Sequence, residues 1–161
     1  MKIRIKPYNK NYPRYFKKEE RILSKLGKLE IYHIGSTAVP KMMGKEWIDI
    51  LLIAKNKKQR DNLIKKLEKI GYKKAKTQRK ERIFLSKVKN RQRYNLHLYL
   101  KGKKALDKIL FRDYLITHPE EAKKYEKLKM VALKKSKGER IAYKRFKEDY
   151  FRKIMGKLRW K

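Results

Sequence analysis

The segment WIDILLI, residues 47–53, places the carboxylate of Asp49 inside a short, almost unbroken apolar run. Such a run predicts a strand that is buried on both faces of a sheet. A carboxylate in that position is unfavourable unless it is paired, hydrogen-bonded or bound to a metal ion. The fold must therefore supply Asp49 with a specific partner, which is either a structural lysine or arginine, or a metal or phosphate ligand.

A turn signal precedes this strand in the segment HIGSTAVP, residues 33–40. Gly35 allows a sharp turn and a close approach of the backbone to a ligand, because it has no Cβ. Ser36 can offer a hydroxyl and a backbone N–H to phosphate oxygens. The same Gly-Ser pair is also typical of an ordinary turn at the end of a strand. Next to the buried carboxylate, the pair suggests a phosphate-handling site.

Hydrophobic periodicity predicts an α+β chain. Strands are expected at 29–34, 47–53, 82–88 and 93–100, and helices at 12–26, 56–70, 106–115, from 119 onward and at 143–155. We expect Asn11 and Asn56 to cap the first two helices. In the last strand, His97 alternates with aliphatic residues, so its side chain should face away from them. The remaining third of the chain reads as helical.

Composition favours one domain. With 161 residues and 40% hydrophobic content, the chain can bury one core, so we expect a single domain over 1–161 with the sheet in about 1–101 and helices in about 102–161. No run has the length of a membrane span, and no apolar signal-peptide core is present. These features predict a cytoplasmic protein. The absence of cysteine excludes disulfides, thiolate metal sites and a cysteine nucleophile.

The net charge of +34 indicates a polyanionic partner. Nucleotides, nucleic acid bound non-specifically through phosphates, and acidic membrane surfaces all meet this description. The distribution of the charge separates two of these possibilities. Cations gathered around the Gly-Ser turn would favour a nucleotide, whereas a broad basic face elsewhere would favour nucleic acid.

Several segments together resemble the GrpB family, a branch of the nucleotidyltransferase superfamily. The resemblance rests on HIGSTAVP and KEWIDILL, on Pro7-Tyr8 and the stretch from Tyr12-Pro13 to Glu20, on NLHL at 95–98, and on FRDYL at 111–115 with His118-Pro119, Tyr125, Leu128-Lys129, Tyr143 and Lys147. These matches run in order along nearly the whole chain. They imply a nucleotidyltransferase-like mixed β-sheet flanked by helices, with a helical carboxy-terminal third.

The resemblance also implies a function, metal-dependent nucleotidyl transfer from a nucleoside triphosphate to an unknown acceptor. The general superfamily pattern has Asp-x-Asp or Asp-x-Glu and a third carboxylate on a later strand, together holding two metal ions. Here Asp49 is followed by Ile50-Leu51, and His97 lies where a third acid might be. Two alternatives therefore stay open, a catalytically reduced nucleotide- or phosphate-binding module and a basic RNA-associated protein.

The candidate residues fall into three groups. The expected catalytic residues are Asp49, His97 and Arg112; the expected phosphate ligands are Gly35, Ser36, Thr37, Lys45 and Lys129; and the expected metal ligands, for Mg²⁺ or Mn²⁺, are Asp49, His33 and His97. Each histidine is equally compatible with a structural hydrogen bond. Arg112 is equally compatible with a surface ion pair.

Overall fold

A computed structural model describes residues 3–159 of the chain. In order, its elements are α1 (Tyr12–Ser24), β1 (Glu30–Ile34), the 3-10 helix η1 (Ser36–Ala38), β2 (Trp47–Ala54), α2 (Lys57–Lys69), β3 (Lys73–Lys74), β4 (Arg82–Lys89), β5 (Gln92–Leu100), α3 (Lys103–Thr117), α4 (Pro119–Lys135) and α5 (Arg140–Arg159). The expected α+β class, the mixed sheet and the helical final third are confirmed.

The five strands form one sheet in the order β1-β2-β5-β4-β3. Strands β2 and β5 are parallel, and the other neighbouring pairs are antiparallel. In the register, Asp49 is opposite Ile34 of β1 and Asn95 of β5. Because side chains alternate between faces along a strand, this register decides which residues share a face with Asp49.

One face of the sheet packs against α1 and α2 and holds the main core. That core includes Leu23, Ile48, Ile50, Leu52, Leu67, Leu85, Leu96 and Leu98, all of which are completely shielded from solvent. A charged pair is buried in the same layer, where Lys87 Nζ donates to Glu19 Oε1. The hydroxyl of Tyr72 donates to the same carboxylate oxygen over 2.9 Å. The two side chains are 8% and 2% exposed, so this pair is part of the core.

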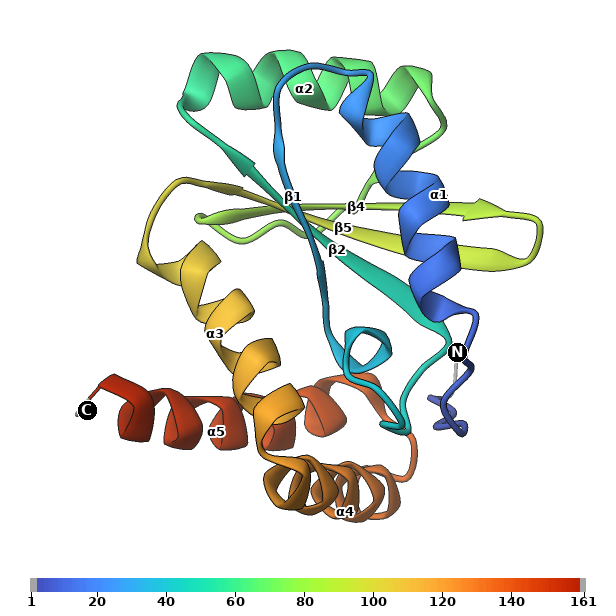
Figure 1. The fold of residues 1–161 in the computed structure, drawn as a ribbon, viewed down its shortest axis with the longest axis vertical. Coiled ribbons are helices and arrows are strands. Elements are labelled where there is room, and N and C mark those ends of the chain that lie inside the picture. Colours follow the sequence, from blue (N-terminus) through green and yellow to red (C-terminus); the bar gives the residue numbers. More distant parts are fainter. Residues whose placement is uncertain (1–2, 160–161) are drawn as a thin grey trace.

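The opposite face is only partly covered. Helix α3 packs on its β1 side over Leu51, Ile53 and Tyr99. Figure 1 shows α2 on one side of the sheet and α4 and α5 together on the opposite side. The part of this face around Asp49 is left facing α5 across a cleft.

Local signals account for most element boundaries. The Asn56 side chain accepts a hydrogen bond from the Gln59 N–H over 2.9 Å, so the expected cap of α2 is confirmed. Asn11 occupies the N-cap position of α1, but its side chain makes no capping hydrogen bond, so that expectation was wrong. Its own N–H instead donates to Asn9 Oδ1 over 2.9 Å. Within residues 3–159 no helix combines the length and the apolarity needed to cross a bilayer.

The apolar residues of α3 do not all face inward. Leu106 and Leu110 are 49% and 50% exposed. The helix turns Ala105, Ile109 and Leu115 inward. Strand β3 has only two residues, Lys73 and Lys74, and hydrophobic periodicity has no signal for an element that short.

Candidate functional site

Asp49 lies at the bottom of the cleft, and the Gly-Ser turn closes against it. Gly35 has a φ of 77°, and a Cβ at this position would lie 2.6 Å from Asp49 Oδ2. Only glycine fits both the backbone conformation and this close approach. Both hydrogen bonds to the carboxylate reach Oδ1, from Asn95 Nδ2 over 3.0 Å and from His97 Nε2 over 3.4 Å. Within the described part of the chain, Oδ2 has no hydrogen-bond donor.

The protonation of Asp49 and His97 follows from their contacts. Burial would raise the pKa of Asp49, but the hydrogen bonds from His97 and Asn95 outweigh it and lower that pKa. Arg82 Nη1 lies 3.3 Å from His97 Nδ1. Because a guanidinium can only donate, Nδ1 must accept, and the ring proton is then on Nε2, facing Asp49. Burial lowers the pKa of His97, so the ring is neutral beside an ionised carboxylate.

Arg82 holds an unsatisfied donor in this network. Its Nε is buried and has no hydrogen-bond partner among residues 3–159. A buried donor without an acceptor costs about 1–3 kcal/mol. An acceptor group supplied by a ligand would remove this cost, so the atom is a candidate contact for an anion.

His33 is not part of this group, although its strand does neighbour β2 as expected. His33 is opposite Ile50, one residue out of step with Asp49, so its side chain is on the other face of the sheet. Its ring stacks on Phe16, with centroids 4.7 Å apart, and its Nε2 lies 2.9 Å from Thr37 Oγ1. The Thr37 hydroxyl donates to the Trp47 carbonyl over 3.2 Å. The structure therefore gives His33 and Thr37 positions that tie the turn to the sheet, away from the metal and phosphate positions expected for them.

The partly buried His33 makes stability depend on pH. Burial lowers the pKa of His33 to about 4, whereas an unfolded chain would have the ordinary value near 6.5. Between these values the unfolded state binds more protons, so the free energy of unfolding should fall as pH falls from about 6.5 toward 4. Between pH 7 and pH 4.5, wild type should lose about 2.5 kcal/mol more than His33→Gln, whose amide can donate to Thr37 without titrating. Urea denaturation measures this difference, and equal losses in the two proteins would contradict it.

Ser36 is held from behind by α4. Lys129 is 1% exposed, and its Nζ donates to the Met43 carbonyl and lies 3.3 Å from Ser36 Oγ. Burial lowers the pKa of Lys129 to about 7. On the other side of the turn, a Cβ on Gly44 would lie 2.5 Å from Ser36 Cβ. Lys129 thus lies beside the turn, where it fixes Ser36 and the loop that follows. Its expected contact with phosphate stays a prediction.

Lys45 and Arg112 reach the cleft from opposite sides. The Nζ of Lys45 lies 4.5 Å from the centre of the Trp47 ring, and burial lowers its pKa to about 8. Arg112 contacts Asp113 through Nε and Nη2, over 2.8 and 2.7 Å, and donates from Nη1 to the His33 carbonyl over 2.8 Å. The ion pair with Asp113 therefore forms, and Arg112 also lines the cleft.

The cleft consists of two connected hollows. The cationic chamber, of about 640 Å³, is lined by eight cationic side chains, Lys45, Lys76, Arg79, Arg82, Arg93, Arg140, Lys144 and Lys147. The apolar chamber, of about 230 Å³, lies between the Gly-Ser loop and α3, α4 and α5. Both chambers include Ser36, Asp49, Arg79, Arg82, His97, Lys144 and Lys147. Among the described residues, Asp49 is the only carboxylate that lines the cationic chamber.

The donor set limits how a metal ion can bind. Residues 3–159 contain no group of three His, Cys, Asp or Glu side chains arranged to hold one. The Nε2 of His97 carries a proton and Nδ1 faces Arg82, so neither nitrogen is free to coordinate. Asp49 Oδ2 fits one position of a Mg²⁺ ion whose other ligands are phosphate oxygens and water. The residues fit a metal that arrives with a phosphate ligand.

Sequence reasoning missed several residues of the site. Asn95 shares the face of His97, and its position two residues earlier in the same strand was a usable signal. Arg79, Arg82 and Lys144 could not be singled out, because the sequence shows 50 lysines and arginines and not their positions in space. The pairing of Arg82 with Tyr99, which brings it next to His97, is a feature of the β4–β5 register.

These observations define an α+β protein with a cleft lined by cationic side chains, in which a Gly-Ser turn faces a strand carboxylate. The family model described as GrpB protein matches residues 2–157, and the chain belongs to the GrpB family. UPF0157 protein YqkA of Bacillus subtilis is 33% identical over 133 residues, covering 80% of this chain and 39% of that protein. A UPF0157 protein of Pseudomonas aeruginosa is 30% identical over 165 residues, covering 97% of this chain and 67% of that protein. The chain thus spans well under half the length of YqkA.

Solved structures give a matching result. The crystal structure of conserved protein GrpB from Enterococcus faecalis aligns with a TM-score of 0.74 and 25% identity, over 94% of this chain and 99% of that one. A structure of the Cid1 poly(U) polymerase aligns with a TM-score of 0.48 and 14% identity, over 69% of this chain and 38% of that one. The alignment with the Enterococcus protein includes nearly all of both chains, so the two proteins share a fold.

Proposed function

We propose that the cleft binds the phosphates of a nucleoside triphosphate, with Ser36 and the surrounding cations as their ligands. The observation that supports this most is the charge of the cationic chamber, eight cations against one carboxylate beside the Gly-Ser turn. Such a site attracts a compact polyanion and offers charge-assisted hydrogen bonds to its oxygens. The buried, unsatisfied Nε of Arg82 adds a donor that an anion would satisfy.

Asp49 should make the site prefer a triphosphate that carries a metal cation over one that does not. A lone carboxylate facing phosphate oxygens is repulsive unless a cation lies between them. A triphosphate that brings Mg²⁺ would meet this need, with Asp49 Oδ2 as the protein ligand. When bound, Mg²⁺ would neutralise part of the phosphate charge.

A more specific form of the proposal is that the protein transfers a nucleotidyl group. The residues of the cleft suggest that such a transfer is slow. Two-metal phosphoryl transfer uses several carboxylate ligands to hold both ions. Among the described residues that line both chambers, Asp49 is the only carboxylate. The neutral His97 can position this carboxylate through its Nε2–H. We therefore favour the catalytically reduced, nucleotide-binding form of the function over rapid transfer. Release of pyrophosphate from α-labelled triphosphates would report any turnover.

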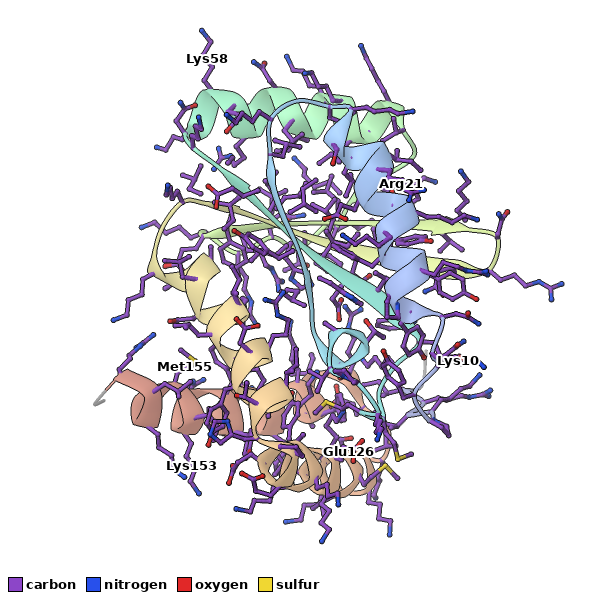
Figure 2. All side chains as sticks on the ribbon, viewed as in Figure 1. Lys10, Arg21, Lys58, Glu126, Lys153 and Met155 are labelled. Atoms are coloured by element: carbon purple, nitrogen blue, oxygen red, sulfur yellow. The ribbon has the colours of Figure 1, made fainter. Side chains whose placement is uncertain are left out.

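Non-specific binding of nucleic acid is a second candidate, favoured by the charge outside the cleft. Figure 2 shows lysine side chains projecting from several sides of the molecule, Lys10, Lys58 and Lys153 among them. Phosphate contacts of this kind are independent of sequence and weaken strongly with salt. They would not depend on Ser36 or Asp49.

Removing two cations from the cleft should test the proposed function. Lys144→Ala combined with Lys147→Ala should weaken ATP binding at least tenfold, because each lost charge-assisted contact is worth about 1.5–3 kcal/mol. Lys58→Ala combined with Lys65→Ala removes the same charge from exposed positions on α2. Calorimetry at one fixed salt concentration should show that this control binds within about twofold of wild type. Equal losses in the two variants would mean that the net charge, and not the cleft, binds ATP.

A further inference from the structure

The apolar chamber differs in chemistry from the cationic chamber that it adjoins. Part of its wall is built from Val39 and Met42 of the loop, Leu115 of α3 and Tyr125 of α4. These residues are only 2–6% exposed, so the wall is set firmly in the helical core. Six cationic side chains line this chamber; four of them also line the cationic chamber, whereas Lys108 and Arg112 belong to this chamber and not to the other. The apolar wall distinguishes this chamber, so the two parts of the cleft suit two different chemical groups.

Aromatic rings form much of the apolar wall. Phe111 lies edge-on to Tyr125 and to Phe151, with ring centroids 5.4 and 5.0 Å away. The Nζ of Lys108 lies 4.1 Å from the centre of the Phe151 ring. The hydroxyl of Tyr125 makes no hydrogen bond within residues 3–159, and Tyr125 lines the chamber. The wall therefore offers ring faces and edges for stacking together with a polar atom for orientation.

The size of the chamber fits a planar ring system. Its volume is about 230 Å³, whereas an apolar cavity of roughly 150 Å³ is known to hold benzene. Ligand pockets of this kind are mostly apolar, with a few polar groups that fix orientation. A fused two-ring group fits this volume. A phosphate group of the nucleotide would gain no favourable contact from an apolar wall.

We propose that the apolar chamber binds a planar aromatic ring, held against Phe111, Tyr125 and Phe151, while the phosphates occupy the cationic chamber. This inference rests on the proposed function for the placement of the phosphates. The ring can be the base of the same nucleotide or belong to a second small molecule whose polar end reaches Asp49. Both sources present the same chemistry to the wall, and one experiment separates them.

The test compares ligands with and without a ring. Calorimetry would measure the affinities of tripolyphosphate and of ATP for wild type, for Phe111→Leu and for Tyr114→Leu. Tyr114 is on the same helix and stacks on His118 without lining either chamber, so it is a matched control. If the base occupies the chamber, ATP should bind about tenfold more tightly than tripolyphosphate. Phe111→Leu should reduce this ratio to about two and leave the affinity for tripolyphosphate unchanged.

A second arm tests for a separate ring-bearing molecule. Naphthol, a neutral fused-ring alcohol, would be titrated into each protein saturated with tripolyphosphate. If the ring comes from a second molecule, ATP and tripolyphosphate should bind equally, and naphthol should bind several-fold more weakly to Phe111→Leu than to Tyr114→Leu. The inference is overturned if neither the ATP preference nor naphthol binding is more sensitive to Phe111 than to Tyr114. Failure of the proposed function looks different, since tripolyphosphate binding would then be unaffected by the loss of Lys144 and Lys147.

Discussion

Lys87→Met should lower the free energy of unfolding by about 3–5 kcal/mol, the range expected when one partner of a buried ion pair is removed. Lys87 and Glu19 are 8% and 2% exposed, and the carboxylate also accepts from the Tyr72 hydroxyl. Without Lys87, the charge of Glu19 stays buried between α1 and the sheet with one neutral donor. Chemical denaturation at neutral pH measures the loss.

Two comparisons show whether the loss comes from the buried charge. Adding Glu19→Gln to Lys87→Met removes that charge, and the double variant should be more stable than Lys87→Met alone. Lys17→Met breaks the exposed pair with Glu20 on the same helix and should change stability by less than about 1 kcal/mol. A similar small change for Lys87→Met would show that Glu19 is not held as a buried charge.

Asp49→Asn should reverse the preference of the cleft between free ATP and its Mg²⁺ complex. In the absence of metal, the variant should bind ATP roughly fivefold more tightly, because the one carboxylate facing the phosphates is neutralised. With Mg²⁺, the ligand is less negative and a purely cationic site would bind it more weakly. Wild type should bind the complex at least as tightly as free ATP, because Asp49 can coordinate the ion. The variant should bind the complex less tightly than it binds free ATP.

Calorimetry in chelator and in excess Mg²⁺ measures all four affinities. Glu68→Gln removes one exposed carboxylate from α2 and should respond to Mg²⁺ as wild type does. The same response to Mg²⁺ in wild type and Asp49→Asn would remove Asp49 from the metal contact. That result would not contradict the proposed phosphate contacts of Lys144 and Lys147, which the double lysine variant tests independently.

Local sequence patterns determined much of the fold. The run 47–53 became β2, the alternation at 93–100 placed His97 on the face away from the aliphatic side chains, and Pro119 begins α4. These features depend on neighbours along the chain, such as the two-residue period of a strand or the fixed φ of proline at a helix start. The GrpB pattern around Gly35 and Asp49 likewise identified the family before any contact was known.

The composition of the site depended on tertiary structure. His33, Asp49 and His97 lie on three adjacent strands, yet only Asp49 and His97 share a face, because the β1–β2 register opposes Asp49 to Ile34. A shift of the β1–β2 register by one residue would have placed His33 on the same face as Asp49, and no local sequence pattern encodes that register. The cations of the cleft come from segments far apart in the chain, Arg79 and Arg82 near the sheet and Lys144 and Lys147 from α5. The sequence alone determined the carboxylate, the turn and the large positive charge. The strand register and the packing of α5 across the sheet together decided which charges surround Asp49. The physical reason is that electrostatic contacts depend on distance in space and not along the chain.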